Sequence, residues 1–556
     1  MARGKRNIES LWHRKSLAGY ILFCQYYNQQ PVGIVTSSTI DETKNWDSTN
    51  SEITTTNASN APRTVIAGQS IQPCPAKIGK GLSRAAKRRK KKRGIHLVDG
   101  SCEADNLRQG TNPQQEAMAE QDKKEVKALE TIQLVDSRLI DAMHKIKAGQ
   151  HVQNFLMTLA KPLPLTFRIR QGISKENEMI LRKELSSYYH HLVAPCSFLD
   201  DRIYQATNTG NTHLSKRTLP QISPALKDFL VEHSTNGTIA RQEVGSMIPV
   251  LALTGTGCIQ GGSRILDLCA SPGSKTLQAM EVVGSQGRVR ANDVNESRLE
   301  DLKDAVLRSG VKHAQDCIRY TCYDASQYPI PSKPNLLYDA VLCDVPCSGD
   351  GTIRKDSHIL PNWTPLTANS LHPIQVKILI RAVKCLKPGG IVAYSTCSLN
   401  PVEDEAVVAA VLLHYNENPV GKDSTTIHLE LMEWPKSNLS GLIHHPGVSN
   451  WKIADYHNRN EDSGNHGIDN HGDEDYDDDA DGDGDDDDDD DEEMPSLQWH
   501  RLYEDAIQAR MQGATASMWP PPTSNVKELH LERCFRLWPH DHDSGGFFVA
   551  LIRRVK

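Results

Sequence analysis

The second half of the chain predicts an α/β fold class, in which helices cover both faces of a parallel sheet. From Ser263 onward, short apolar runs alternate with helical patterns, as in a doubly wound sheet. A turn with proline and glycine follows the first run, and aspartates end the first three runs. Ligands of such sheets bind at the carboxyl ends of the strands, so these residues predict a binding site there.

The strands are identified by runs of Ile, Val, Leu and Ala that end in turn residues. In chain order they are expected at 264–268, 287–292, 317–321, 339–343, 391–396 and 546–552. Between them, leucines and valines recur at helical spacing. The helices are expected at 275–283, 295–309, 374–386 and 403–413.

The first half of the chain predicts a smaller α+β region. Strand-like and helical pieces mix within residues 151–250, and helix formers dominate from Pro113 to about Lys147. The apolar piece at 17–24 is shorter than the roughly 20 residues of a membrane span, so an amphipathic helix of the fold is expected there. The expected domains are a helical segment at 1–36, an insertion at 37–113, a helix with a small α+β domain at 114–250, and the large domain at 251–556.

Charge is unevenly distributed along the chain. Residues 461–493 contain 20 acidic residues and no Lys or Arg; because the whole chain carries −7, the remainder carries +13. A basic body suits a polyanion partner. The acidic block at 461–493 and the polar insertion at 37–113 are expected to be disordered. Within the insertion, Lys87–Arg93 predicts a nuclear or nucleolar address. A non-specific RNA contact and a solvated charge block are the alternatives.

The cysteine pattern favours free thiols. The 13 cysteines show neither the spacings of a disulfide framework nor those of a zinc module. A reducing compartment and no metal are therefore expected, and no apolar stretch is long enough to cross a membrane.

The turn at 267–273 predicts a nucleoside cofactor. Its glycine pattern is not the dinucleotide fingerprint. Asp293 lies 20 residues beyond Gly273, where a carboxylate can accept both ribose hydroxyls, and Asp324 can accept from an adenine amino group. Without a phosphate loop, S-adenosylmethionine fits better than ATP, and Lys275 can face its methionine carboxylate. Each aspartate alone is more often a cap or turn residue.

Two cysteines follow predicted strands of the same sheet. Cys347 comes after the strand at 339–343, and Cys397 after the strand at 391–396. Most single cysteines are inert buried thiols, but two at one rim, near a cofactor turn, suit covalent catalysis. C5 of cytosine becomes nucleophilic only when a thiolate adds at C6. The residues themselves leave open which of the two thiols attacks.

Three motifs closely resemble the Nop/Sun family of RNA cytosine-5 methyltransferases. They are DLCASPGSKT at 267–276, DVPCSGDGT at 344–352 and YSTCSLNPVE at 394–403. Further segments, at 163–169, 241–249 and 530–537, resemble the eukaryotic transfer-RNA branch. The resemblance implies a Rossmann-like class I S-adenosylmethionine-dependent methyltransferase domain with a smaller α+β N-terminal region that binds RNA.

The resemblance also implies roles for individual residues. Cys397 is expected to attack C6, Cys347 to assist release of the methylated base, and Asp344 to hydrogen-bond the cytosine and to border the cofactor. Asp293 and Asp324 would hold the ribose and the adenine. The methionine end would be lined by Cys269, Ala270, Ser271, Pro272, Gly273 and Lys275.

The favoured hypothesis is methylation of transfer RNA by a nuclear enzyme, with a monomer expected. An enzyme acting on ribosomal RNA and a catalytically silent RNA-binding assembly factor are the alternatives; retention of both thiols and Asp344 argues against the second. The target base must be extruded into the pocket, assisted by cations. The candidates for these backbone contacts are Arg168, Arg170, Arg354 and Lys355.

Overall fold

The structure is a computed structural model of the whole chain. It describes residues 19–30, 142, 149–207, 214–311, 313–416, 427–435, 439, 441–456, 496–522 and 527–555. All of them belong to one compact unit. The basic run at 87–93, the insertion at 37–113, the acidic block at 461–493 and nearly all of the helix expected at 113–147 lie outside the described residues.

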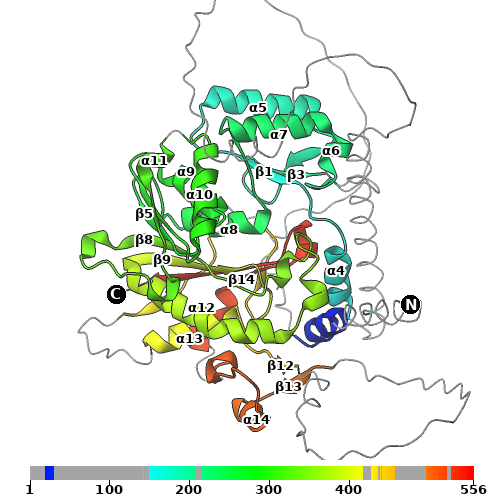
Figure 1. Cartoon of the computed structure of the whole chain (residues 1–556), viewed down its shortest axis with the longest axis vertical. Coiled ribbons are helices and arrows are strands. Elements are labelled where there is room, and N and C mark those ends of the chain that lie inside the picture. Colours follow the sequence, from blue (N-terminus) through cyan, green and yellow to red (C-terminus); the bar gives the residue numbers. More distant parts are fainter. Residues whose placement is uncertain are drawn as a thin grey trace, which may run out of the picture. The chain divides into compact units, whose positions relative to one another are not determined.

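A nine-stranded sheet forms the centre of the large domain (Figure 1). Five parallel neighbours run in the order β7-β6-β5-β8-β9. Their bounds are β5 Arg264–Asp267, β6 Arg288–Asn292, β7 Ile318–Thr321, β8 Tyr338–Asp344 and β9 Leu386–Thr396. The chain leaves β5 towards β6 and returns to β8 on the other side, which makes the edge above β5 a topological switch point.

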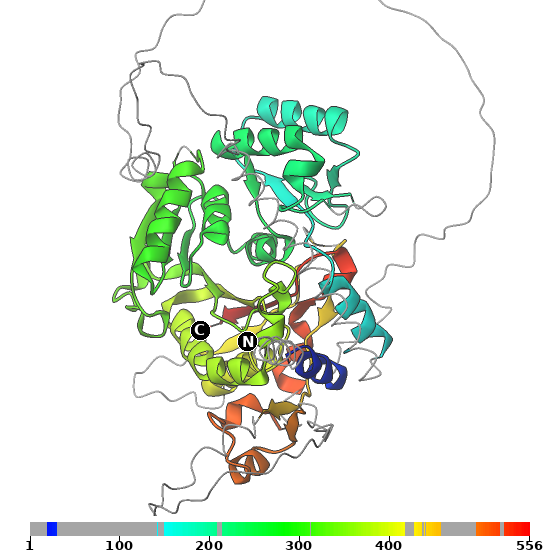
Figure 2. The same ribbon diagram turned by 45° about the vertical axis from the view of Figure 1, so that its right-hand side comes forward.

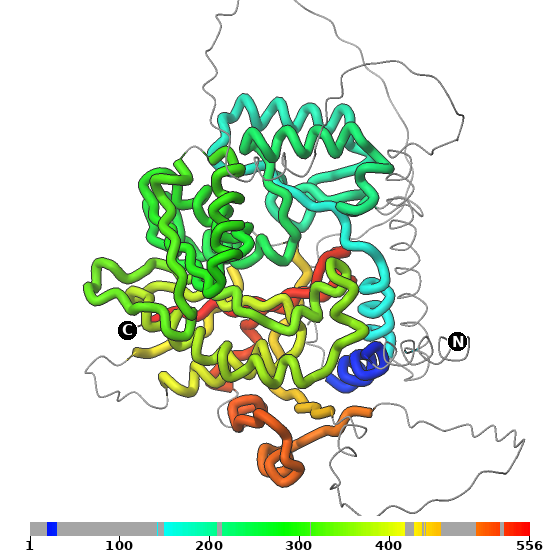
Figure 3. Tube along the Cα trace, in the orientation of Figure 1, coloured from blue at the N-terminus to red at the C-terminus, as the bar shows by residue number. Residues whose placement is uncertain are grey.

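The last strand in the chain, β15 (Phe547–Arg554), lies between two other strands of the sheet. It is antiparallel to β9 and is paired on its other side with β14 (Phe535–Leu537) and β10 (Leu429–Leu431). It lies inside the sheet, not at its edge, as the red tube in Figure 3 shows. β11 (His445–Pro446) extends the sheet beyond β14. Because every residue of β9 between Ile391 and Thr396 has a partner on β15, the strand that carries Cys397 is held on both sides.

Helices cover both faces of this sheet. One face packs against α8 (Val244–Gly255), α9 (Ser274–Val283) and α10 (Glu296–Arg308). The other packs against α12 (Pro365–Cys385) and α13 (Glu405–Asn416). Consecutive residues of β5, Ile265 and Leu266, point to opposite faces of the sheet and lie in different apolar clusters. Both faces are therefore covered, which confirms the expected α/β doubly wound class.

A second, four-stranded antiparallel sheet precedes the large domain in the chain. Its order is β2-β3-β1-β4, with bounds Val193–Pro195, Ile203–Ala206, Thr166–Ile169 and Ile239–Arg241. The helices α5 (Lys175–Tyr188) and α7 (Pro224–Thr235) pack on it (Figure 2). The expected smaller α+β region is therefore present.

Residues 19–29 form a helix, and most of its side chains are buried. Its aromatic rings pack against α4 (Gln150–Leu159), which lies beside it in Figures 1 and 3: the centroids of Phe23 and Phe155 are 6.0 Å apart. Tyr26 donates to Asn400 Oδ1 at 2.7 Å. The amphipathic helix expected at 17–24 is thus part of the core beside the loop that follows β9.

Element boundaries differ from expectation in two informative places. α12 begins at Pro365, nine residues before the expected 374, because Pro365 fits the first turn of a helix and Pro373 is accommodated inside it. α13 begins at Glu405 instead of 403, because residues 401–404 form a turn. That turn buries Glu403 and Asp404.

Arg536 on β14 is expected to be a major contributor to stability. Its guanidinium is 2% exposed; Nε donates to Glu405 Oε1 at 2.6 Å, and Nη1 donates to the carbonyl of Leu399 at 2.8 Å. Arg536→Met leaves Glu405 buried without its partner, so the free energy of unfolding should fall by about 3 to 5 kcal/mol. Denaturant unfolding measures it. Arg553→Met, which removes a half-exposed arginine 3.9 Å from Glu430, should cost less than about 1 kcal/mol. Equal losses in the two variants would contradict the expectation.

Candidate active site

The turn between β5 and α9 is shaped by a glycine that no other residue replaces easily. Gly273 has a φ of +105°, and an added Cβ would lie 2.2 Å from Cδ1 of buried Leu302. The backbone therefore comes close to α10. The N-cap residue of α9 is this glycine, so no capping side chain bonds to the amide groups of its first turn. Such a turn can bring backbone donors next to a ligand at the sheet edge.

Asp267, the last residue of β5, was predicted to lie at the binding edge but was given no role there. It is 1% exposed and accepts a hydrogen bond from Thr276 Oγ1 at 2.7 Å, whereas its Oδ1 atom is buried without a hydrogen-bond partner among the described residues. Burial raises its pKa to about 7. Its position at the end of the first parallel strand was the available signal, because that is the switch point of the sheet.

Asp293 lies directly beside the glycine turn. Its Oδ2 accepts from the backbone amide of Ser271 at 3.2 Å and its Oδ1 from the amide of Asn295 at 3.0 Å. Asn292, one residue earlier and fully buried, bridges the carbonyls of Leu268 and Tyr323. The carboxylate thus stands at the end of β6, as expected, and also fixes the turn.

Asp324 follows β7 and begins a short 3-10 turn. Its Oδ1 accepts from the amide and the hydroxyl of Ser326, each at 2.8 Å. These contacts are those of a capping residue, and the side chain is only partly buried. Asp267, Asp293 and Asp324 therefore end three neighbouring parallel strands, β5, β6 and β7.

The register of β8 and β9 sets the centre of the site. Asp344 is paired directly with Ser395, and Ser395 Oγ donates to Asp344 Oδ1 at 2.8 Å. Lys275, from the first turn of α9, donates to Asp344 Oδ2 at 2.8 Å and to Ser246 Oγ at 3.2 Å. Burial lowers the pKa of the Lys275 ammonium, but the attraction and hydrogen bond of Asp344, with Cys397 and Asp267, outweigh it and raise the pKa. Lys275 therefore links the glycine turn to the end of β8.

The two predicted cysteines meet. The sulfur atoms of Cys347 and Cys397 are 3.2 Å apart, and both thiols are free and partly buried. The hydrogen bond with Cys397, together with burial and the charge of nearby groups, raises the pKa of Cys347 well above its usual range. Cys269 and Cys343 also lie at this edge, but burial raises the pKa of both thiols. The pair at one rim is the feature that the strand ends predicted.

Glu403 orders the loop that carries Cys347 and was missed from the sequence. It is fully buried and accepts from the Ser348 amide at 2.8 Å, the Ser348 hydroxyl at 2.5 Å and Gln375 Nε2 at 3.1 Å. Gln375 also donates to the carbonyl of Pro346 at 2.8 Å. A buried glutamate is unusual unless it is paired, but burial is not visible in a sequence that places Glu403 at a helix start.

The two cysteine loops are also joined through their backbones. The amide of Gly351 donates to the carbonyl of Cys397 at 2.9 Å, and a Cβ on Gly351 would lie 2.5 Å from the carbonyl oxygen of Gly546. Asp350, beside it, accepts from the Leu399 amide at 2.9 Å and from the hydroxyl of Tyr27. The glycine in this motif is required by close packing of three segments.

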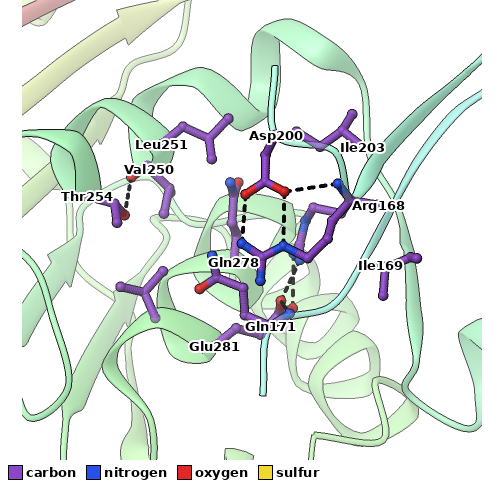
Figure 4. A pocket seen from close by; sticks show the side chains of 12 residues that line it. Arg168, Ile169, Gln171, Asp200, Ile203, Val250, Leu251, Thr254, Gln278 and Glu281 are labelled. Carbon is purple, nitrogen blue, oxygen red and sulfur yellow. Dashed lines mark hydrogen bonds and ion pairs between the residues drawn. The ribbon is translucent and has the colours of Figure 1, made fainter. Parts of the chain in front are cut away.

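Three of the four cations expected to contact RNA are buried in ion pairs, so that expectation was wrong for them. Arg168 and Arg170 both pair with Glu281 of α9, and their side chains are 6% exposed. Arg168 and Glu281 line the hollow shown in Figure 4. Arg354 donates to three carbonyls and to Asp543 at 2.5 Å. Arg168 and Arg170 therefore fasten the end of β1 to α9, and Lys355 alone of the four is exposed.

The fold and the site together define a class of protein. A parallel sheet with its switch point at β5, an antiparallel strand inserted next to β9, a glycine turn and three strand-end aspartates make this a Rossmann-like class I S-adenosylmethionine-dependent methyltransferase fold. Within the described ranges, no helix is long and apolar enough to cross a membrane, and no three or more His, Cys, Asp or Glu side chains are grouped to hold a metal ion.

Comparison with known proteins finds similar sequences. Residues 258–433 match the family model described as 16S rRNA methyltransferase RsmB/F. The multisite-specific tRNA:(cytosine-C(5))-methyltransferase trm4b of Schizosaccharomyces pombe is 31% identical over 74% of this chain and 57% of its own length. The tRNA (cytosine(34)-C(5))-methyltransferase of Drosophila melanogaster is 30% identical over 72% of this chain and 50% of its own length.

A bacterial relative matches a shorter region. The ribosomal RNA small subunit methyltransferase F of Aeromonas salmonicida is 36% identical over 33% of this chain and 37% of its own length. Among solved structures, a methyltransferase homologue from Pyrococcus horikoshii has a TM-score of 0.44 at 20% identity, over 73% of this chain and 91% of that one. The chain spans about half the length of the eukaryotic relatives that it matches.

Glu403 should make stability fall with rising pH. Burial, with repulsion from Asp350, raises its pKa from 4.5 to about 7. The unfolded chain therefore releases this proton first, so the free energy of unfolding drops as pH rises from about 4.5 to 7, by up to roughly 3 kcal/mol. Glu403→Gln mimics the protonated acid and should remove this part of the slope in denaturant unfolding at pH 5 and pH 8. Glu430→Gln, at a half-exposed site, should leave the slope as it is; equal slopes in wild type and Glu403→Gln would contradict the expectation.

Proposed function

We propose that the protein is an RNA cytosine-5 methyltransferase that takes its methyl group from S-adenosylmethionine and acts on transfer RNA. One observation supports this most strongly: the sulfur atoms of Cys347 and Cys397 lie 3.2 Å apart at the carboxyl edge of the sheet that carries the glycine turn. A binding protein needs no such pair, which disfavours a silent assembly factor.

The residues at the edge suit S-adenosylmethionine. It supplies an activated methyl group when bound. Asp293 and Asp324 would hold the ribose and the adenine, and the segment 269–273 with Lys275 would line the methionine end. The unpartnered Oδ1 of buried Asp267 supports this fit, because it offers an acceptor at the switch point. A bound amino group there would satisfy it.

The thiols would divide the chemistry between them. Cys397 Sγ adds to C6 of the cytosine, and the electron pair of the C5–C6 bond becomes available at C5. Asp344 holds the base edge and stabilises the charge that develops on the ring. C5 takes the methyl group, and S-adenosylhomocysteine is the leaving group. The C5 proton is then removed, its electron pair re-forms the C5–C6 double bond, and the Cys397 thiolate is expelled from C6. The raised pKa of the Cys347 thiol suits a group that stays protonated while Cys397 acts as the nucleophile.

Transfer RNA is the favoured substrate because the two eukaryotic relatives that match nearly three quarters of this chain are named for it. Ribosomal RNA is the second candidate, favoured by the name of the matching family and by the bacterial relative. Bisulfite sequencing of both RNA classes from cells lacking the protein separates them. Loss of ribosomal sites alone would overturn the choice of transfer RNA.

A nuclear location is part of the proposal. It is supported by the basic run Lys87–Arg93 and by the positive charge of the chain outside 461–493. Imaging of the tagged protein with that run replaced by glutamines tests it, since an unchanged distribution would contradict it.

Substitution of the two thiols should give opposite products. Cys397→Ala should abolish both the methylated base and the covalent adduct, since no nucleophile reaches C6. Cys347→Ala should accumulate an RNA–protein adduct that survives a denaturing gel, because release is slowed. Incubation with radiolabelled RNA and S-adenosylmethionine measures both.

Cys258→Ala serves as the control, because that thiol lies at the start of the domain and donates to the Asp339 carbonyl at 3.1 Å. It should retain product formation. An adduct in Cys397→Ala, or its absence in Cys347→Ala together with normal product, would reverse the two roles.

Gly273→Ala should weaken S-adenosylmethionine binding by at least about tenfold. The added Cβ would collide with Leu302 and disfavours the positive φ, so the turn must shift away from the sheet edge. Titration calorimetry of wild type and variant measures it. Gly261→Ala, where nothing lies within 4 Å of the added atom, should bind as wild type does. Equal affinities would place the cofactor away from this turn.

A further inference from the structure

Four arginines gather on one face of the sheet, away from the thiol pair. A surface hollow is lined by Arg264, Arg288, Arg290 and Arg319, with Val289, Cys317 and Tyr338. The parallel register places Arg264 beside Arg288 and Arg290 beside Arg319. Because side chains two residues apart on a strand share a face, all four point the same way. We call this cluster the arginine face.

The arginine face is exposed because the helix layer on that side ends early. Leu266, paired with Arg290, belongs to the apolar cluster that contains α12. α12 packs against β8 and β9, while the chain between β7 and β8 contains only the short turns η2 (Ala325–Gln327) and η3 (Pro334–Leu336). Arg288 and Arg319 are exposed, and the other two arginines are partly buried.

The four guanidinium groups differ from the buried arginines of the described ranges in what they contact. Among the described residues, none of them lies within ion-pair distance of a carboxylate, in contrast with Arg168, Arg170, Arg354 and Arg536 of the same chain. Arg264 stacks 5.8 Å above the ring of Tyr338, and its Nε is buried without a hydrogen-bond partner. Like charges that line one hollow repel one another, and a bound anion would relieve the repulsion.

We propose that the arginine face binds the phosphate backbone of the RNA substrate, outside the catalytic edge and without regard to sequence. This rests on the proposed function, since the occupant is the RNA whose cytosine is methylated. Guanidinium forks match phosphate oxygens in pairs, and an open row of them suits a polyanion. β6 runs for five residues, roughly 16 Å, so an RNA that fills the catalytic edge and continues along the sheet reaches this face.

The test is a pair of double variants compared in RNA binding. Arg288→Gln/Arg319→Gln removes the two exposed arginines of the face. Lys303→Gln/Arg308→Gln is the matched control: it removes two cations from α10, on the other side of the sheet, that are already paired with Glu300 and Asp304. Fluorescence anisotropy with a labelled transfer-RNA transcript, at several salt concentrations, gives Kd and its salt slope.

The arginine variant should bind the transcript on the order of tenfold more weakly, with the slope of log Kd against log salt reduced by about 1 for each phosphate that is no longer neutralised by an arginine. The control should change both much less. Methylation of the transcript should show a raised KM at unchanged kcat, and a stem-loop too short to leave the catalytic edge should be methylated equally by all proteins.

Equal RNA affinity in the two double variants would overturn the proposal. Binding of inorganic phosphate alone at micromolar concentration, lost in the arginine variant while RNA binding persists, would also overturn it and assign the face to a small anion. If the wild type binds RNA through this face but methylates none, the proposed function fails and the RNA site stands.

Discussion

The parallel register between β8 and β9 is the constraint on which the site depends. It places Asp344 opposite Ser395, so the residues that follow the two strands, Cys347 and Cys397, emerge side by side. A shift of one residue would turn Ser395 to the other face of the sheet and separate the sulfurs. β15 prevents such a shift, because it pairs with β9 along its whole C-terminal half and is itself held by β14.

Buried carboxylates position the loops that follow β8 and β9. Glu403 holds the amide and hydroxyl of Ser348, Asp350 holds the amide of Leu399, and Glu405 holds Arg536. Burial of so many acids in one place costs folding free energy, as the raised pKa values of Glu403 and Asp350 indicate. The hydrogen bonds of these carboxylates offset part of that cost, and they order the two loops that bring the thiols together. The site is therefore built from polar contacts at the end of a sheet whose interior is apolar.

Arginine serves two different purposes in this chain. Arg168, Arg170, Arg354 and Arg536 are buried, bidentate or multiply bonded, and they join segments that are distant in sequence. Those of the arginine face are without acidic partners among the described residues and lie on strands. The difference lies in the surroundings. Helices α9 and α13 carry Glu281 and Glu405 to the buried arginines. The described chain from β7 to β8 has only short turns, and it provides no acidic partner for the arginine face. Net charge alone does not distinguish the two groups.

The sequence by itself determined the α/β class, the order of the strands along the chain and the thiol pair, because strand ends, turns and motif residues are local features. Asp293, Asp324 and Asp344 were placed at the correct strand ends for the same reason. Tertiary structure alone decided that β15 enters the sheet beside β9, that Glu403 and Asp267 are buried, and that Arg168 and Arg170 are paired inside the fold. Each of these depends on which distant segment packs against a residue. The type of a side chain does not indicate which segment that will be. The two cysteines are therefore readable as a pair from the sequence, while their 3.2 Å separation follows from the register and the buried polar contacts of the folded chain.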